Sequence, residues 1–123
     1  MANYPTTALA TRTAAYAKAI RLFTGDVPKT LATVDDLKQL VRASGSIGMT
    51  YLETQEWTSK RRCIGCMKMC RKEARECVFW LRQLEPALPQ DLKDESRRLE
   101  KEALALMWIF THSINVARGA DPD

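Results

Sequence analysis

The residues best equipped for chemistry lie in the segment CIGCMKMC, residues 63–70. Cys63 and Cys66 have the spacing of one half of a zinc knuckle, and Cys70 and Cys77 follow them. Thiolates at such a spacing can bind a metal ion or act as a redox pair, because the thiolate is both the metal ligand and the nucleophile. A third interpretation places all four side chains in a helix core, where free cysteine behaves as a small hydrophobe.

Helical spacing favours the core interpretation of these cysteines. At about 100° per residue, the four side chains fall within about 60° of one another on one helix face. Four thiolates spread along that face span roughly 20 Å and cannot share one ion. The sequence has a single histidine, His112, to complete a site, and a disulfide between Cys63 and Cys66 is disfavoured by helix geometry. We therefore predict reduced core cysteines and neither a metal site nor a cofactor.

The elements that position these thiols are predicted to be helices. Apolar residues recur at spacings of three and four, and the alternation typical of strands is missing. Four helices are expected, at about residues 7–23, 33–55, 58–85 and 90–118. Short connections favour antiparallel neighbours, so the predicted fold is all-α, an antiparallel up-down four-helix bundle. We expect one domain over residues 1–123, with an ordered core at about residues 7–118.

Local signals set the predicted helix ends. The run Thr24-Gly25-Asp26 is expected to break the first helix, and Thr33 is expected to cap the second. Pro86 and Pro89 frame the third connection, and Gly119 is the expected stop of the last helix. Inside the second helix, Gly45 and Gly48 are predicted to let a neighbouring helix approach closely.

Composition limits the class of protein. The chain has 123 residues, a hydrophobic fraction of 46% and a net charge of +4. It has no apolar run near the roughly 20 residues that a membrane span needs, and its first residues lack the order of a signal peptide. The sequence predicts a cytoplasmic protein without a membrane partner. The positive charge permits a nucleic-acid or acidic partner without requiring one.

Some large side chains lie away from the predicted core stripes. On the second helix these positions are Arg42, Ser46, Met49, Glu53 and Trp57, and on the third they are Met69, Glu73, Glu76 and Trp80. Tryptophan and methionine outside a core suggest a protein contact, although lateral packing within the bundle is the alternative. The predicted oligomer interface consists of Arg42, Glu53, Met69, Glu73 and Trp80.

The central third of the chain resembles a known family. The run LVRASGSIGMTYLETQEWTSKRRCIGCMKMCRKEAREC, followed by VFWLRQL, is similar to bacterial four-helix-bundle proteins related to those encoded in intervening sequences of 23S ribosomal RNA genes. The matching positions are Arg42, Ala43, Ser44, Ser46, Ile47, Tyr51, Glu53, Ser59, Lys60, Lys72, Glu73, Ala74, Glu76, Trp80 and Leu81. The resemblance implies an antiparallel bundle, a homopentamer and no known enzymatic activity. Thr50 replaces the family's asparagine, and Cys70 and Cys77 replace its alanine and threonine.

These residues allow three classes of function. An enzyme would need converging catalytic groups, and Glu53, Glu73 and Glu76 or the pair Ser59 and His112 are its weak candidates. The favoured class is a non-enzymatic oligomeric scaffold with weak nucleic-acid binding. Its predicted nucleic-acid contacts are Lys60, Arg61, Arg62 and Lys68, in a segment where seven cations face one carboxylate. The alternative is a protein-binding adaptor ring without nucleic acid, and a metal- or thiol-dependent enzyme is the least favoured.

Overall fold

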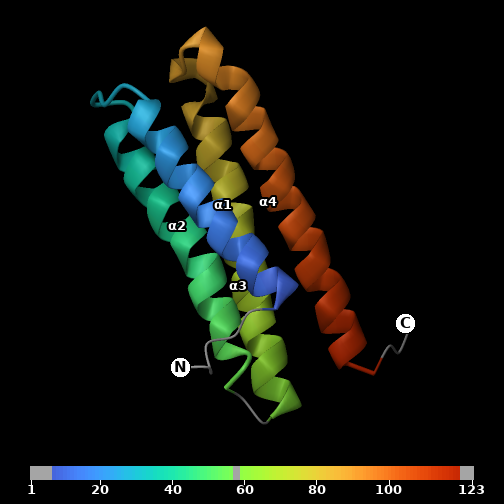
Figure 1. Ribbon diagram of the computed structural model, residues 1–123. Helices are drawn as coiled ribbons and strands as arrows, with labels where there is room; N and C mark the ends of the chain where they lie inside the picture. Colours follow the sequence, from blue (N-terminus) through green and yellow to red (C-terminus); the bar gives the residue numbers. More distant parts are fainter. Residues whose placement is uncertain (1–6, 57–58, 120–123) are drawn as a thin grey trace.

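The structure is a computed structural model that describes residues 7–56 and 59–119, and these residues form four long helices (Figure 1). The helices are α1 (Ala8–Asp26), α2 (Val34–Glu53), α3 (Lys60–Leu84) and α4 (Gln90–Ala117), with a short 3₁₀ helix, η1 (Glu85–Ala87), before α4. Successive helices run in opposite directions along the bundle. The predicted all-α, up-down four-helix bundle is confirmed.

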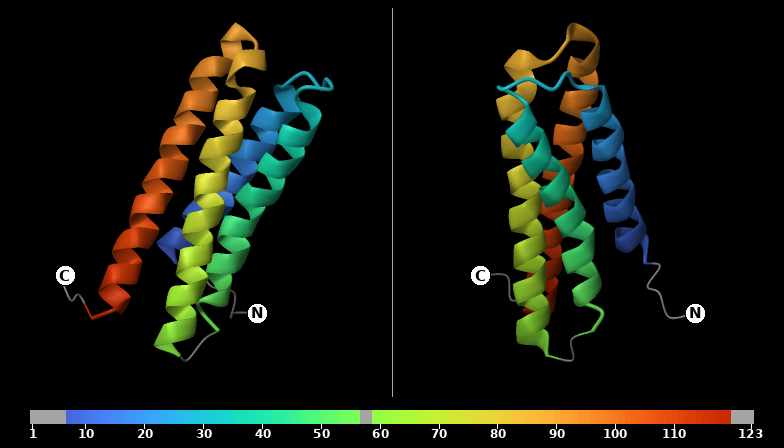
Figure 2. Two further views of the ribbon diagram at one scale, coloured as in Figure 1. Left: turned by 180° about the vertical axis from the view of Figure 1, so that it is seen from behind. Right: turned by 90° about the vertical axis from the view of Figure 1, so that its left-hand side faces the viewer.

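The seams between the helices differ in extent. α3 packs extensively against both α2 and α4, whereas α1 packs against α2 and only sparsely against α4. Figure 2 shows α1 set apart at one side of the bundle. Two contacts close the α1–α4 seam. The Tyr16 hydroxyl donates to the Leu99 carbonyl at 2.9 Å, and Arg12 pairs with Glu102 at 2.7 Å.

The core is a continuous apolar column between the helices. Its fully buried side chains include Ile20, Leu40, Ile47, Leu81, Leu99, Leu106 and Phe110. Each such side chain stabilises the fold by about 1.5–3 kcal/mol relative to exposure, before the cost of chain ordering. Every buried side-chain nitrogen or oxygen in the described residues has a hydrogen-bond partner. Within these same ranges, no helix is long and apolar enough to cross a bilayer.

The end of α1 differs from the sequence prediction. The helix continues through the run Thr24-Gly25-Asp26, which was expected to break it, and stops at Asp26. The Lys29 ammonium donates to the carbonyls of Thr24 at 2.7 Å and Gly25 at 3.1 Å. These carbonyls belong to the last turn of the helix. The Thr24 carbonyl also accepts from the Val27 amide at 3.3 Å, and the cation from the following loop adds support to the extra turn.

The other helix ends follow their predicted signals, with one difference in mechanism. Ser59 caps α3 by accepting from the Arg62 amide, and Gly119 follows α4 with a φ of 91°. Thr33 stands at the start of α2, but its hydroxyl donates to the Pro28 carbonyl at 2.7 Å and accepts from the Thr30 amide at 2.9 Å. It therefore stabilises the α1–α2 loop instead of capping the helix.

Gly48 marks a close approach between α1 and α2. A Cβ atom at this position would lie 3.1 Å from the Thr13 Oγ1 atom, whereas a Cβ at Gly45 would find its nearest neighbour at 3.8 Å. The Thr13 hydroxyl is directed at the carbonyls of Leu9 and Ala10, which limits its freedom to move. The predicted packing role of the two glycines is thus strongest at Gly48.

The four cysteines do not share one environment, which corrects the prediction that all are core residues. Cys70 and Cys77 are fully buried, and the Cys70 thiol donates to the Ile47 carbonyl at 3.5 Å. Cys63 is half-buried and packs against the core. Cys66 is also half-buried but lies at the α2 side of α3, with its sulfur 4.0 Å from the Glu53 carboxylate.

We expect thiol labelling to divide the cysteines into two pairs. Burial raises the pKa of Cys70 to about 12 and that of Cys77 to about 12, so both remain protonated and shielded in the folded state. A disulfide reagent at neutral pH should modify Cys66 and Cys63 in the native protein and the other two only after unfolding. The Cys66→Ser variant, as a control, should lose one rapidly labelled thiol. Four equally slow thiols would contradict the structure.

Candidate nucleic-acid interface

The outer face of α3 carries cations at a regular interval. Arg61, Lys68 and Arg75 are exposed and stand seven residues apart, and we call these three residues the α3 stripe. Seven residues correspond to about 10.5 Å along a helix, so the stripe is about 21 Å long. Seven residues also fall just short of two full turns, so the three side chains lie within about 40° of one another. The helix thereby presents a straight row of positive charge.

The stripe residues differ from other cations of α3 in their ion pairing. None of the three forms an ion pair within residues 7–56 and 59–119. Other cations of α3 are engaged inside the chain. Lys72 pairs with Glu76 at 3.2 Å, and Arg82 pairs with Glu100 at 2.8 Å. The three cations of the stripe are therefore available to contact an anionic partner molecule.

The predicted nucleic-acid residues all lie on the surface, and they divide between two places. Lys60, Arg61 and Arg62 occupy the first turn of α3, and Lys68 lies further along the helix. All four are exposed. A helix start carries a partial positive charge, so cations there are electrostatically unfavourable for the helix itself. Their position is better suited to an anion from outside the chain.

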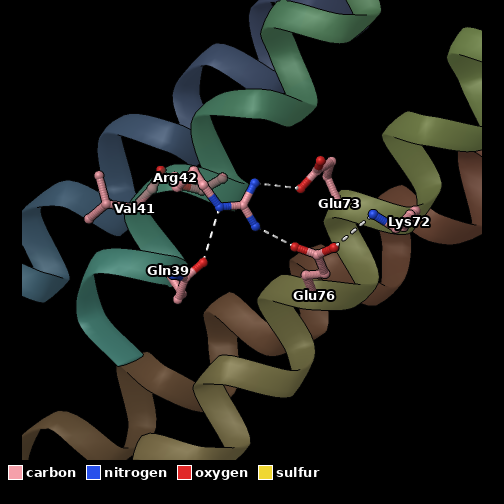
Figure 3. A network of polar contacts seen from close by, with 7 residues as sticks. Gln39, Val41, Arg42, Lys72, Glu73 and Glu76 are labelled. Atoms are coloured by element: carbon pink, nitrogen blue, oxygen red, sulfur yellow. Dashed lines mark hydrogen bonds and ion pairs between the residues drawn. The ribbon is translucent and has the colours of Figure 1, made fainter. Parts of the chain in front are cut away.

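Arg42 is the centre of a polar network between α2 and α3 (Figure 3). Its guanidinium donates to Glu73 at 3.4 Å and to Glu76 at 2.5 Å, and its Nε atom donates to Gln39 at 3.1 Å. Lys72 adds a second cation to Glu76. The Glu73 side chain is only 10% exposed, so it lies in the α2–α3 seam and not on an open face. The network thus connects α2 to α3 and stabilises their packing.

The two carboxylates of the network respond to it in opposite directions. Burial raises the pKa of Glu73, and the neighbouring negative charge of Glu76 adds to the increase. Burial also acts to raise the pKa of Glu76, but the hydrogen bonds from Arg42 and Lys72 outweigh it and lower that pKa overall. Folding thus favours the charged form of Glu76 and disfavours the charged form of Glu73.

These shifts predict unequal effects of two matched substitutions on stability. A lowered pKa gives stability that is present above the unfolded value of 4.5 and is lost as pH falls through the folded pKa. A raised pKa gives stability that is present below the unfolded value and is lost as pH rises through the folded pKa. At pH 7, Glu76→Gln should therefore destabilise the protein by about 1 kcal/mol, whereas Glu73→Gln should cost less.

Urea unfolding at neutral and acidic pH measures this difference. The cost of Glu76→Gln should shrink as pH falls below about 4.5, because the wild-type carboxylate is then protonated as well. Glu73→Gln serves as the control, since it removes a carboxylate from the same network. If Glu76→Gln lowered the free energy of unfolding equally at neutral and acidic pH, the stabilising role assigned to the charged Glu76 carboxylate would be wrong.

The other predicted interface residues are distributed between surface and seam. Met69 and Glu53 are exposed, and Met69 lies with Glu53 and Cys66 along a shallow groove between α2 and α3. Trp80 is half-buried and packs against the core, which is the lateral packing that the sequence left open as an alternative. Trp57 lies outside the described residues. The oligomer interface itself stays a prediction.

The weak catalytic candidates each have a structural partner. Ser59 caps α3, and His112 stacks on Trp108 with ring centroids 5.5 Å apart and planes 2° from parallel. Glu73 and Glu76 are ion-paired to Arg42. Within the described part of the chain, no group of three or more histidine, cysteine, aspartate or glutamate side chains is arranged to hold a metal ion.

Sequence reasoning missed two residues of this surface. Arg75 was counted among the local cations but not assigned to the interface, although its seven-residue interval from Lys68 was available as a signal. Phe79 is not among the predicted contact residues, but the structure exposes 51% of it on the outer face of α3. Arg71, in contrast, turns aside and donates to the Thr111 hydroxyl at 3.2 Å.

Comparison with known proteins identifies the fold and no more. The chain is similar to the crystal structure of a protein of unknown function from the S23 ribosomal protein family of Bacteroides thetaiotaomicron. The TM-score is 0.71 at 17% sequence identity, over 86% of this chain and 97% of that one. No protein-family model matches this chain, and no curated protein matches it. The link to proteins encoded in 23S intervening sequences stays a prediction.

Proposed function

We propose that this protein is a non-enzymatic, homo-oligomeric helical scaffold that binds nucleic acid through its phosphate backbone. The observation that carries the proposal is the α3 stripe, an exposed row of three cations that form no ion pair with a carboxylate of the described residues. Cations that contact phosphates release the counterions condensed on nucleic acid, which gives affinity without sequence preference. The stripe stands on a rigid helix whose opposite face is buried in the core, so its spacing is fixed before binding.

The first turn of α3 extends this surface. Lys60 and Arg62 add positive charge beside Arg61, and all three are exposed. An exposed cation contributes only about 0–1 kcal/mol to folding, so a cluster at an unfavourable end of the helix dipole is better explained by a partner. The proposed contact surface is therefore the stripe together with this turn.

Self-assembly would multiply the effect of each stripe. Exposed Met69 lies with Glu53 along the groove between α2 and α3, and exposed Met49 lies along the groove between α1 and α2. Large apolar side chains at a surface support contact between copies. The family resemblance implies five copies. Several stripes on one particle raise the effective concentration of binding sites, so weak single contacts would combine into useful avidity.

Salt-dependent binding of the wild-type protein tests the proposal. Fluorescence anisotropy with RNA and DNA should start at about 10 mM salt, where charges interact over about 30 Å. We expect the logarithm of affinity to fall linearly with the logarithm of salt concentration, with a slope magnitude of at least about 2 for three phosphate contacts. The solution mass with and without RNA should be measured by light scattering on the same sample.

The possible results separate the two parts of the proposal. Absence of binding to either nucleic acid at low salt, with an intact oligomer, would leave the protein-binding adaptor ring as the function. A strict monomer at micromolar concentration would contradict self-assembly. Sequence-specific binding that is insensitive to salt would contradict the backbone contact.

A further inference from the structure

Phe79 is an apolar side chain in a polar setting. It lies on the outer face of α3 and is 51% exposed. Its neighbours one turn away along α3 are Arg75 and Glu76 before it and Arg82 and Gln83 after it. Glu76 pairs with Arg42 and Lys72, and Arg82 pairs with Glu100, so Arg75 is the adjacent cation that forms no ion pair within the described residues. An exposed phenylalanine one turn beyond the last cation of the α3 stripe is not explained by the core of the bundle.

A second aromatic ring fixes the position of Phe79. The Trp80 ring meets it edge to face, with centroids 4.8 Å apart and planes at 82°. Trp80 is itself half-buried and packed against the core. Such edge-to-face pairs are favourable arrangements of aromatic rings, so Trp80 holds the Phe79 ring in place at the surface.

We propose that Phe79 is a stacking platform for a base of single-stranded nucleic acid, whose phosphates lie along the α3 stripe. This inference rests on the proposed function and specifies its ligand. Proteins that bind single strands combine a positively charged track with aromatic side chains, because every base has a face that can stack. From Arg61 to Phe79 the helix spans about 27 Å, with the cations and the ring on one line.

Charge and ring together select this ligand over the alternatives. A duplex keeps its bases inside, so it can use the cations but not the ring. A protein segment could cover the ring, but it would also need acidic groups at the interval of Arg61, Lys68 and Arg75. A flexible single strand supplies both the regular negative charge and the exposed base faces.

The test compares three probes that differ in one property each. Anisotropy should be measured with an oligouridylate of about 12 nucleotides, within the usual site sizes, with an abasic strand of equal phosphate number and with a duplex. The wild-type protein should bind the oligouridylate more tightly than the abasic strand. Phe79→Leu should weaken oligouridylate binding by about 5- to 150-fold and leave abasic-strand binding and the salt slope unchanged.

A second variant of Phe79 and the comparison of two strands with the wild-type protein serve as controls for this test. Phe79→Trp retains a stacking face and should preserve the oligouridylate preference. Equal affinity of the wild-type protein for the base-bearing and abasic strands would overturn the stacking inference, while their salt dependence would leave the proposed function intact. A change in solution mass in Phe79→Leu would place Phe79 in an interface between copies and would also overturn the inference. Failure of the wild-type protein to bind any probe would remove both.

Discussion

Replacing Arg61, Lys68 and Arg75 together with Gln is expected to lower the affinity of the protein for nucleic acid by at least about tenfold at low salt. Each lost phosphate contact should reduce the salt slope by about one unit, so the triple variant should lose about two to three units. The cause is loss of counterion release and not of folding, because these exposed side chains form no ion pair within the described residues.

A control variant that removes the same charge from other helices tests whether the position of the cations on α3 matters for binding. Lys18, Lys38 and Lys101 are exposed cations on α1, α2 and α4, away from α3. Replacing these three with Gln removes the same net charge and should change affinity much less. Anisotropy titrations at several salt concentrations measure both variants. Equal losses in the two triple variants would show that net charge, and not the row on α3, determines binding.

The largest expected effect on stability comes from Phe110. This side chain is fully buried and lies 6.2 Å from the Tyr51 ring, between centroids. Phe110→Ala removes a large apolar side chain and leaves a cavity, so it should destabilise the protein by about 3–5 kcal/mol. That is a large fraction of the stability of a typical domain, which is about 5–15 kcal/mol.

Phe79→Ala provides the control for the same chemical change at the surface. With about half of its ring already exposed, Phe79 should cost about 1 kcal/mol or less on truncation. Urea unfolding followed by circular dichroism measures both variants. Similar costs for the two phenylalanines would contradict the burial assigned to Phe110.

The fold could be predicted from the sequence because its signals are local. Helix spacing, the Ser59 cap, Pro86 and Gly119 together define the helices without knowledge of their neighbours. The exception was the end of α1. There Lys29, a residue beyond the helix, donates to the carbonyls of Thr24 and Gly25, and the Val27 amide also donates to Thr24. These contacts from outside the helix outweigh the effect of the glycine near its end.

The environments of individual side chains were less predictable because they depend on two helices at once. The four cysteines lie within an arc of about 60° on α3, which is wide enough to include both core positions and positions at the edge of the core. Helical periodicity alone therefore did not distinguish the half-buried Cys66 from the buried Cys70. The pairing of Arg42 with Glu73 joins residues on different helices and has no signature within either. The sequence predicted Arg61 and Lys68 of the α3 stripe but not Arg75, because the density of positive charge is a clearer signal at the start of α3 than in its middle.

The sparse seam between α1 and α4 has a consequence for partial unfolding. A helix with fewer neighbours opens at a lower free energy than the whole domain, so we expect α1 to be the helix least protected against amide hydrogen exchange. α3 packs mainly against α2 and α4, so we expect its amide hydrogens to exchange only when a larger part of the bundle unfolds. We therefore expect the α3 stripe to keep its geometry when α1 opens, so that the proposed single-strand site on α3 stays intact during this partial unfolding.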